Sequence, residues 1–559
     1  MDAKQSKFAI KLLPSLADFA FLMPILFLFG RMDGARTLLA DGDSGWHIRT
    51  GQWILANHRV PVSDLFSFSR PGQVWFAWEW LADIVWAWLV AHGGLATLVL
   101  FCALLIAATY TLLYRLARRK ANPLIALAVT MIATAASSVH WLARPHLFTL
   151  LFVVLFYIVL ERERDGRRQV FGAPFLVLLP AATVVWTNLH GGFVAGIAMI
   201  GAYAVGELLR MAFAAAAPER REAWCAARRY LLASFFCLAA SLVNPYTYHL
   251  HVHVFQYLRD PFQSDHIAEF LTVSFHHPLA IFFEILLLAG AATAAWNLSR
   301  RSFIEPVLIA LWAHAALLSA RNIPLFAIVA APPVAAALER WIESLALSNT
   351  AAWFRAASRR YLDAAAGLAE TEAISRWHPV SALAALAVAA LLFAPNPPAK
   401  FRAEFDPKSF PAAAVDALRA GPPARIFAYD QWGDYLIYRL YPSTRVFLDG
   451  RSDFYGDDFE NDVIDIETVK YDWEKTLNKF DIDTILLSPG APLAGALKES
   501  ARWRLVYDDG VALVFRSAAT QPGPIVPAGA DSGGLCRDRE ITKTEARDRP
   551  IALFNHSTT

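Results

Sequence analysis

The feature that most constrains this chain of 559 residues is a series of long apolar runs. A helix rises about 1.5 Å per residue, so crossing roughly 30 Å of hydrocarbon takes about 20 apolar residues. About eleven runs meet or approach that length, and they predict a multi-pass α-helical membrane protein. The predicted spans are 12–31, 81–113, 122–142, 146–160, 171–189, 193–212, 230–243, 279–297, 304–320, 324–339 and 379–394.

The composition agrees with a membrane protein. Hydrophobic residues make up 56% of the chain and charged residues 18%, whereas soluble domains carry about a quarter charged residues. The formal net charge is only +2, so we expect no nucleic-acid partner.

The distribution of Lys and Arg predicts the orientation. Basic clusters recur at every second loop, and such loops are retained in the cytoplasm. We therefore expect a protein of the cytoplasmic (inner) membrane with a cytoplasmic N-terminus. With an odd number of spans, everything after about residue 396 lies outside. The alternate loops are poor in Lys and rich in Asp, His, Asn and aromatic residues, which makes them the candidate functional loops.

The pattern changes near residue 396 from long apolar runs to short strands and helices. Strands are expected at 425–429, 445–448, 484–487, 503–507 and 511–515, and their alternation with helices predicts a small α/β domain with a partly parallel sheet. The predicted organisation is a polytopic domain over 1–395 with a large first external loop at 32–80, an extracytoplasmic α/β domain over 396–518, and a disordered tail over 519–559.

The first external loop holds the densest group of polar residues. Asp41 and Asp43 are separated by one residue, so they can share a divalent cation or divide the roles of base and metal ligand. The alternative is that Asp43 merely caps a helix starting at Ser44. A cap needs neither His47 nor Arg49, which follow within two turns.

Asp43, His47 and Arg49, followed by Pro61 and Asp64, resemble the first external loop of oligosaccharyltransferase catalytic subunits. Those enzymes belong to the GT-C superfamily of polyprenyl-phosphate-dependent membrane glycosyltransferases. The resemblance implies a GT-C-like fold in which Asp43 is catalytic and contacts a metal. It leaves Asp41 as an assisting catalytic residue.

Two shorter segments also resemble this family. The segment 264–269 is similar to a loop motif that ends in a metal-contacting Glu, here Glu269. The segment 430–435 is similar to the Trp-Trp-Asp motif that reads the acceptor peptide, but it contains only Trp432. Asparagine-linked protein glycosylation is therefore not implied.

The family's second acidic motif is missing, because the segment 140–146 contains no carboxylate. A metal site would then combine Asp43 and Glu269 with His47, His140 and His146. Carboxylate ligands favour Mg or Mn, and imidazole ligands favour Zn or Mn, so a divalent metal is a candidate cofactor of open identity.

Three arginines are candidates for binding the donor phosphate, since a guanidinium can hold a phosphate with paired hydrogen bonds. They are Arg49, Arg144 and Arg321. For Arg144 and Arg321 the alternative is a side chain that snorkels from the end of a span.

A second group is a candidate acceptor-binding or loop-docking face. It consists of Asp64, Glu79, Trp432, Tyr435, Asp449 and Arg451. Asp449 and Arg451 follow a predicted strand, where α/β sheets usually hold ligands, although a salt-bridged turn would explain them equally.

These features predict a glycosyltransferase that moves a sugar from a polyprenyl-phosphate-linked donor to a glycan, lipid or protein acceptor at the extracytoplasmic face. The alternative is a non-catalytic membrane scaffold or transport component of envelope polysaccharide assembly, which the missing acidic motif favours.

Overall fold

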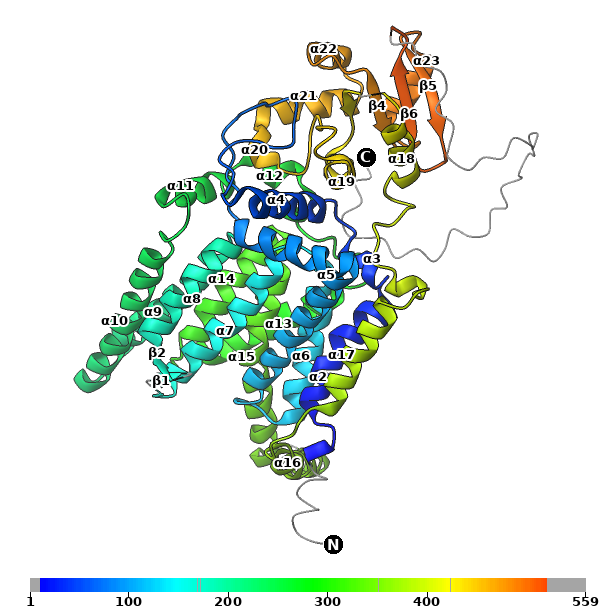
Figure 1. The fold of residues 1–559 in the computed structure, drawn as a ribbon. Helices are drawn as coiled ribbons and strands as arrows, with labels where there is room; N and C mark the ends of the chain where they lie inside the picture. Colours follow the sequence, from blue (N-terminus) through cyan, green and yellow to red (C-terminus); the bar gives the residue numbers. More distant parts are fainter. Residues whose placement is uncertain (1–10, 168, 171, 350, 423, 520–559) are drawn as a thin grey trace. The chain divides into compact units, whose positions relative to one another are not determined.

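A computed structural model describes residues 11–519, except 168, 171, 350 and 423. Its contacts divide the chain into two compact units (Figure 1). The helical unit comprises 1–35 and 96–402, and the mixed unit comprises 36–95 and 403–559. From residue 520 on, the tail predicted over 519–559 lies outside the described residues.

The helical unit contains helices, several short helical turns and one short hairpin. Their bounds are α2 Leu16–Leu26 with the π-helical turn η1 Phe27–Arg31, α6 Pro123–Ser137, η2 Ser138–His140, α7 His146–Arg164, α8 Phe175–Leu189, α9 Phe193–Phe213, α10 Ala217–Ala240, α11 Tyr248–Tyr257, α12 Pro261–His266, η3 Ala268–Phe270, α13 Ala280–Ser299, α14 Ile304–Leu318, η4 Ala320–Asn322, α15 Ile323–Leu347, α16 Ala352–Glu372, α17 Pro379–Leu392 and η5 Ala399–Phe401. A short hairpin, β1 Gln169–Val170 and β2 Ala173–Pro174, precedes α8.

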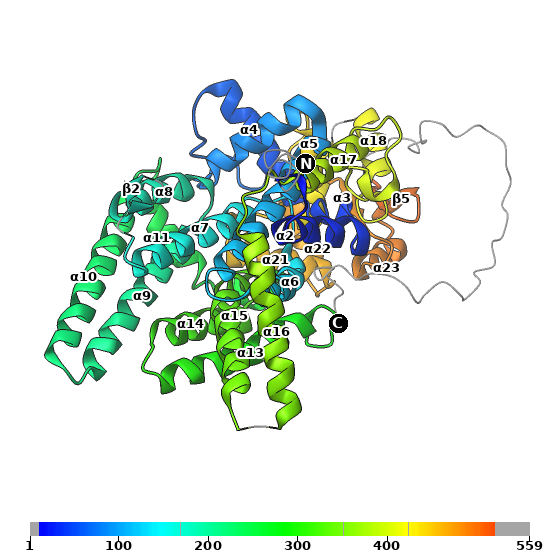
Figure 2. The same ribbon diagram turned by 90° about the horizontal axis from the view of Figure 1, so that it is seen from below.

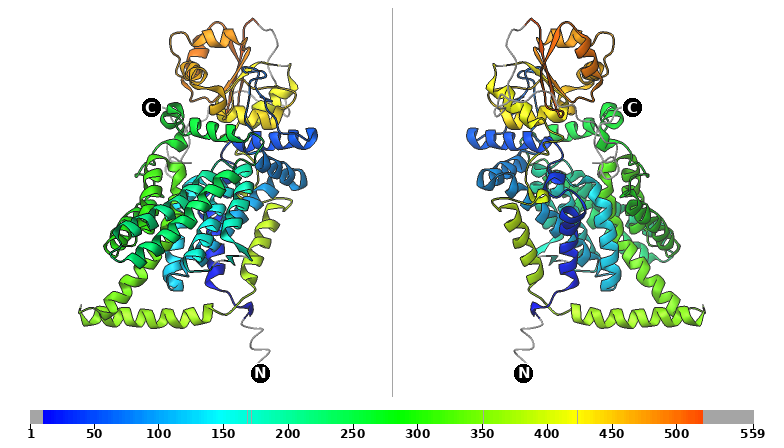
Figure 3. Two further views of the ribbon diagram at one scale, coloured as in Figure 1. Left: turned by 90° about the vertical axis from the view of Figure 1, so that its left-hand side faces the viewer. Right: turned by 90° about the vertical axis from the view of Figure 1, so that its right-hand side faces the viewer.

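Helix α15 forms the centre of this unit. It packs against α6, α7, α13, α14 and α16, and every residue from Ile323 to Ala335 is buried. Helices α9 and α10 lie side by side as a pair (Figure 2). Helix α16 runs across the direction of the other long helices of the unit (Figure 3).

A helix occurs at the position of each predicted span, but the count of about eleven crossings is not confirmed. Within the described residues, five helices are long and apolar enough to cross a membrane: Trp80–Ala117, Pro123–His140, Phe193–Phe213, Ala280–Ser299 and Ala320–Leu347. Three apolar helices are shorter, namely Phe175–Leu189, Ile304–Leu318 and Pro379–Leu392.

Helix α5 (Trp80–Ala117) consists of two helices merged across a break at Gly93 and Gly94. Gly94 has φ of +65°, a left-handed conformation that glycine adopts without a steric penalty. The chain passes from the mixed unit into the helical unit just beyond this break, after Leu95.

The mixed unit has one hydrophobic core to which both of its sequence segments contribute. Trp46, Phe66 and Trp75 come from the first loop, and they are buried together with Trp432 and Phe447 from the C-terminal segment. Aromatic side chains bury large apolar areas, so this shared core joins two segments that lie more than 300 residues apart in sequence.

The sheet of the mixed unit has the strand order β3-β4-β6-β5. Strand β3 (Ile426–Phe427) is parallel to β4 (Thr484–Leu487), whereas β6 (Leu513–Ser517) is antiparallel to β4 and to β5 (Trp503–Asp508). The helices are α3 Ala35–Leu38, α4 Asp43–Asn57, α18 Ala412–Ala420, α19 Asp430–Leu440, α20 Ser452–Tyr455, α21 Asp457–Glu467, α22 Trp473–Lys479 and α23 Pro492–Glu499. A small, partly parallel sheet agrees with the prediction.

The strand predicted over 445–448 is not part of that sheet. The Phe68 N–H donates to the Val446 carbonyl, and the Val446 N–H donates to the Phe66 carbonyl, each at 2.9 Å. Ser67 and Val446 therefore form an isolated parallel bridge. The backbone groups of this segment are satisfied by the first loop, which the local sequence could not reveal.

Candidate functional site

Asp43 is the first residue of α4, and its side chain is not the helix cap. The Asp43 backbone N–H donates to Asp41 Oδ1 at 2.9 Å, so Asp41 supplies the capping contact. The Asp43 side chain is nevertheless buried, with 5% of the residue exposed.

Asp434, on α19, meets Asp43 beside Gly450. A Cβ atom added at Gly450 would lie within 2.7 Å of both Asp43 Oδ1 and Asp434 Oδ2. The Gly450 N–H donates to Asp434 Oδ1 at 2.9 Å. Oδ2 of Asp434 is buried and has no hydrogen-bond partner among the described residues. Only glycine at position 450 leaves room for the two carboxylates to approach this closely.

The electrostatics of this pair follow from its burial. Asp434 is fully buried, and burial is the main cause that raises the pKa of Asp434 well above its usual range. The neighbouring Asp43 and Asp449 carboxylates raise it further. A proton or a cation is therefore more stable between Asp43 and Asp434 than a second negative charge.

His47, one turn after Asp43, lies between two carboxylates. Its Nδ1 is 2.6 Å from Asp83 Oδ1, and its Nε2 is 3.6 Å from Glu79 Oε2. Asp83 belongs to the first turn of α5, where Gly51 of α4 contacts its backbone. The side chains of Asp83 and Glu79 thus fix the orientation of the imidazole.

Arg451 joins the first loop to the C-terminal segment through a fully buried ion cluster. It donates to Asp64 Oδ1 at 2.8 Å and to both carboxylate oxygens of Asp449 at 2.7 Å. Its guanidinium carbon also lies 4.5 Å from the Trp75 ring centroid and 4.9 Å from that of Phe454. The two functions predicted for this face, acceptor binding and loop docking, both stay predictions.

Trp432 and Tyr435 are buried in the core of the mixed unit. The Trp432 indole N–H donates to the Ser409 carbonyl at 2.9 Å, and Tyr435 Oη accepts from Arg439 at 2.5 Å. Arg49 binds the Tyr438 carbonyl through its Nε at 2.9 Å and thereby ties α4 to α19. The acceptor and phosphate roles of these residues stay predictions.

A second cluster lies in the helical unit and is built around Glu269. Glu269 Oε2 is 3.1 Å from Arg144, and Glu269 Oε1 is 3.1 Å from Arg321. Burial acts to raise the pKa of Glu269, but the two guanidinium groups outweigh it and hold the pKa at about 2. One carboxylate thus faces two cations, and the cluster keeps a net positive charge.

Three histidines surround this ion cluster. His140 Nε2 is 3.7 Å from Glu269 Oε2, and His146 donates from Nε2 to the His140 carbonyl at 3.1 Å. The Gly192 N–H donates to His190 Nδ1 at 2.9 Å, so His190 carries its proton on Nε2. Burial, followed by Arg321 and Arg144, lowers the pKa of His190 to about 3, and its ring is neutral near pH 7.

Among the described residues, no group of three or more His, Cys, Asp or Glu side chains could hold a metal ion. The Asp43–Asp434 pair fits a divalent cation, since Mg²⁺ often takes only one or two protein carboxylates and Asp434 Oδ2 lacks a partner. At Glu269 the guanidinium groups occupy both oxygens, an arrangement that suits an anion. The metal-binding roles of Glu269, His47, His140 and His146 stay predictions.

The sequence reasoning missed Asp434 and Asp83 as members of these clusters. Asp434 follows Trp432 and Gly433 in the motif-like segment, and that position was the available signal. Asp83 has no comparable signal, because its partner His47 lies 36 residues away in sequence.

No protein-family model and no curated protein matches the chain. Among solved structures, the oligosaccharyltransferase AglB of Archaeoglobus fulgidus, in complex with an inhibitory peptide and a dolichol-phosphate, has a TM-score of 0.52 at 13% identity, over 91% of this chain and 74% of AglB. The apo form of the oligosaccharyltransferase from this archaeon gives 0.50 at 12% identity, over 84% and 69%.

The chain has a GT-C-like fold. The resemblance seen in the first loop is thereby confirmed at the level of the fold, while identities of 12–13% leave the substrates undetermined. ArnT of Cupriavidus metallidurans, bound to undecaprenyl phosphate, matches with a lower TM-score of 0.44 at 15% identity, over 91% of this chain and 98% of ArnT.

Proposed function

We propose that this chain is a membrane glycosyltransferase that transfers a sugar from a polyprenyl-phosphate-linked donor to an acceptor at the extracytoplasmic face of the cytoplasmic membrane. One observation carries the proposal: Asp43 and Asp434 form a buried carboxylate pair in a chain with a GT-C-like fold. AglB is an oligosaccharyltransferase that has been captured with a peptide and dolichol-phosphate, which supports a lipid-linked donor and a separate acceptor.

The carboxylate pair supplies the base. The acceptor nucleophile attacks the anomeric carbon of the sugar while the bond from that carbon to the donor phosphate oxygen breaks. The nucleophile's proton passes to Asp43, and the bonding electrons leave with the phosphate. Burial raises the pKa of Asp434 well above its usual range, so we assign the base role to Asp43 and not to Asp434. If a divalent cation is bound, Asp43 and Asp434 would hold it, and it would supply positive charge for the transfer.

The Arg144–Glu269–Arg321 cluster of the helical unit is by itself complementary to a phosphate. Glu269 orients both guanidinium groups and neutralises only one of the two charges. Preorganised donors of this kind stabilise charge that develops in a transition state, because they need no reorganisation at the moment of reaction. We assign these two arginines to the donor phosphate and Glu269 to positioning them.

The test is transfer of a labelled sugar from a lipid-linked donor by the purified protein carrying Asp43→Asn. We expect a loss of at least about 100-fold, as is usual when a general base is removed. Asp508→Asn is the matched control, since Asp508 is an exposed carboxylate that accepts one backbone N–H at 3.0 Å. Unchanged transfer by Asp43→Asn would refute the catalytic role. Donor binding without transfer by the unmodified protein would favour the non-catalytic scaffold.

A further inference from the structure

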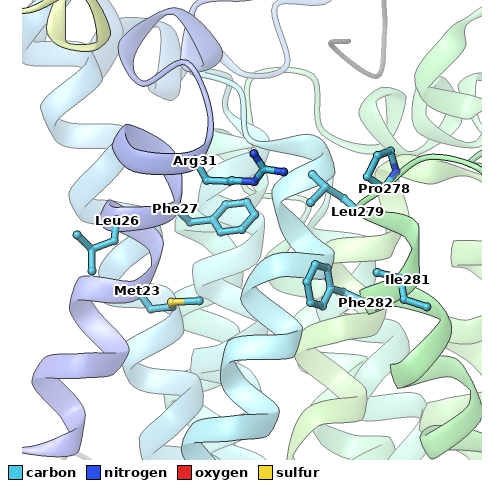
Figure 4. Close-up of a pocket in the computed structure, with 8 residues that line it drawn as sticks. All are labelled: Met23, Leu26, Phe27, Arg31, Pro278, Leu279, Ile281 and Phe282. Atoms are coloured by element: carbon cyan, nitrogen blue, oxygen red, sulfur yellow. The ribbon is translucent and has the colours of Figure 1, made fainter. Parts of the chain in front are cut away.

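A cavity of about 490 Å³ lies within the helical unit between α2–η1 and the beginning of α13 (Figure 4). Met23, Leu26 and Phe27 line one side, and Leu279, Ile281 and Phe282 line the other. Its volume falls in the range of small-molecule sites. Leu26 and Ile281 are 62% and 48% exposed, so apolar side chains are left uncovered here.

The backbone of α2 is irregular where it borders this cavity. Pro24 interrupts the helical hydrogen bonds, and the five residues from Phe27 to Arg31 form a π-helical turn closed by the Met32 N–H on the Phe27 carbonyl at 2.9 Å. Isolated π-helical turns occur frequently at functional sites. This turn sets Arg31 beside the cavity, next to Phe27 and Leu279 (Figure 4).

Arg31 is an exposed cation without a counter-ion. Within residues 11–519, apart from the four omitted ones, its guanidinium forms no hydrogen bond and no ion pair. A guanidinium at the edge of an apolar cavity is complementary to an amphiphile that carries a negative head group.

The cavity is separate from the Glu269 cluster. Phe27 packs edge to face against Trp141, with ring centroids 6.2 Å apart. Trp141 directly follows His140, which contacts Glu269. Arg31 lines the cavity whereas Arg144, Arg321 and Glu269 do not, so a chain held in the cavity meets Arg31 and not the Glu269 cluster.

We propose that this cavity binds an anionic membrane phospholipid, with one acyl chain between α2 and α13 and the phosphate paired with Arg31. Uncovered apolar side chains in a membrane protein are reached directly from the bilayer, so a lipid can enter this cavity from the side. The inference rests on the membrane fold and not on the proposed transferase activity.

The experiment uses the full-length protein in nanodiscs and a phosphatidylglycerol probe with a photoreactive group on one acyl chain. We expect cross-links in 23–27 and 279–282. Arg31→Gln should reduce the labelling about fivefold, the usual contribution of one basic residue to binding an anionic lipid, and Arg31→Lys should retain it. Ile281→Trp should block labelling by filling the cavity.

The matched controls lie at the other end of α13. Arg300→Gln removes a guanidinium that stacks 4.6 Å from the Trp296 centroid, and Leu298→Trp enlarges a half-exposed side chain. Both should label like the unmodified protein. Equal labelling by a phosphatidylcholine probe, unchanged labelling of Arg31→Gln, or stronger competition by a polyprenyl phosphate than by phosphatidylglycerol would each overturn the proposal.

Discussion

Replacing Asp434 by Asn should stabilise the protein while impairing sugar transfer. The two carboxylates meet beside Gly450, so their nearer oxygens are at most about 5 Å apart. At about 5 Å, ionising Asp434 beside a charged Asp43 would cost about 3 kcal/mol with an effective dielectric constant of about 20. Remaining protonated at neutral pH also costs free energy, because Asp434 is ionised in the unfolded chain. Asn keeps the oxygen that accepts from the Gly450 N–H and removes the charge. We therefore expect a gain of up to about 3 kcal/mol at neutral pH.

The pH dependence has a definite sign. The folded-state pKa of Asp434 is raised above 3.8, so the unmodified protein loses stability as the pH rises from about 4 through the folded-state pKa. The gain from Asp434→Asn should be absent below pH 4, where both proteins are neutral at this position, and largest at high pH.

Thermal unfolding of the detergent-solubilised protein, followed by intrinsic fluorescence at several pH values, measures this difference. Asp508→Asn, at an exposed and similarly bonded carboxylate, should show no such trend. A loss of stability in Asp434→Asn at high pH would refute the repulsion argument. If that loss appears only with Mg²⁺ present and disappears with a chelator, the pair binds a cation.

Three further outcomes follow from individual contacts. Gly45→Ala should destabilise the protein by about 1–3 kcal/mol in chemical unfolding, because the new Cβ would lie 2.7 Å from the Asp434 carbonyl. Arg451→Ala should cost about 3–5 kcal/mol in the same assay, since it leaves two buried carboxylates without a cation. The pKa of Glu269 is lowered to about 2, so the stability that its ionised form contributes should be complete above pH 4.5 and should disappear as the pH falls towards 2. Thermal unfolding of Glu269→Gln should lack that pH dependence.

The positions of the helices could be predicted because they depend on local properties. Every apolar run corresponds to a helix, since apolar length and the absence of charge are visible in a short window. The boundaries were less accurate. Helix α10 begins at Ala217, 13 residues before the predicted start of the span at 230–243. Charged residues are compatible with a helix that extends beyond the apolar region.

The partners of the site residues could be predicted only in part. Asp43 was identified from its neighbours, but its pairing with Asp434 depends on the packing of α4 against α19, nearly 400 residues further along the chain. In the same way, the sequence was equally compatible with a local salt-bridged turn at Arg451. Only the fold shows that Arg451 also binds Asp64.

By itself, the sequence determined that this chain is a helical membrane protein with a small α/β segment and a polar first loop, because hydropathy and strand patterns are local. The tertiary structure alone decided that the first loop shares a core with the C-terminal segment, that Asp434 faces Asp43, and that Glu269 holds Arg144 and Arg321. Such contacts depend on which distant surfaces are complementary in shape and charge, and no short window of sequence contains that information.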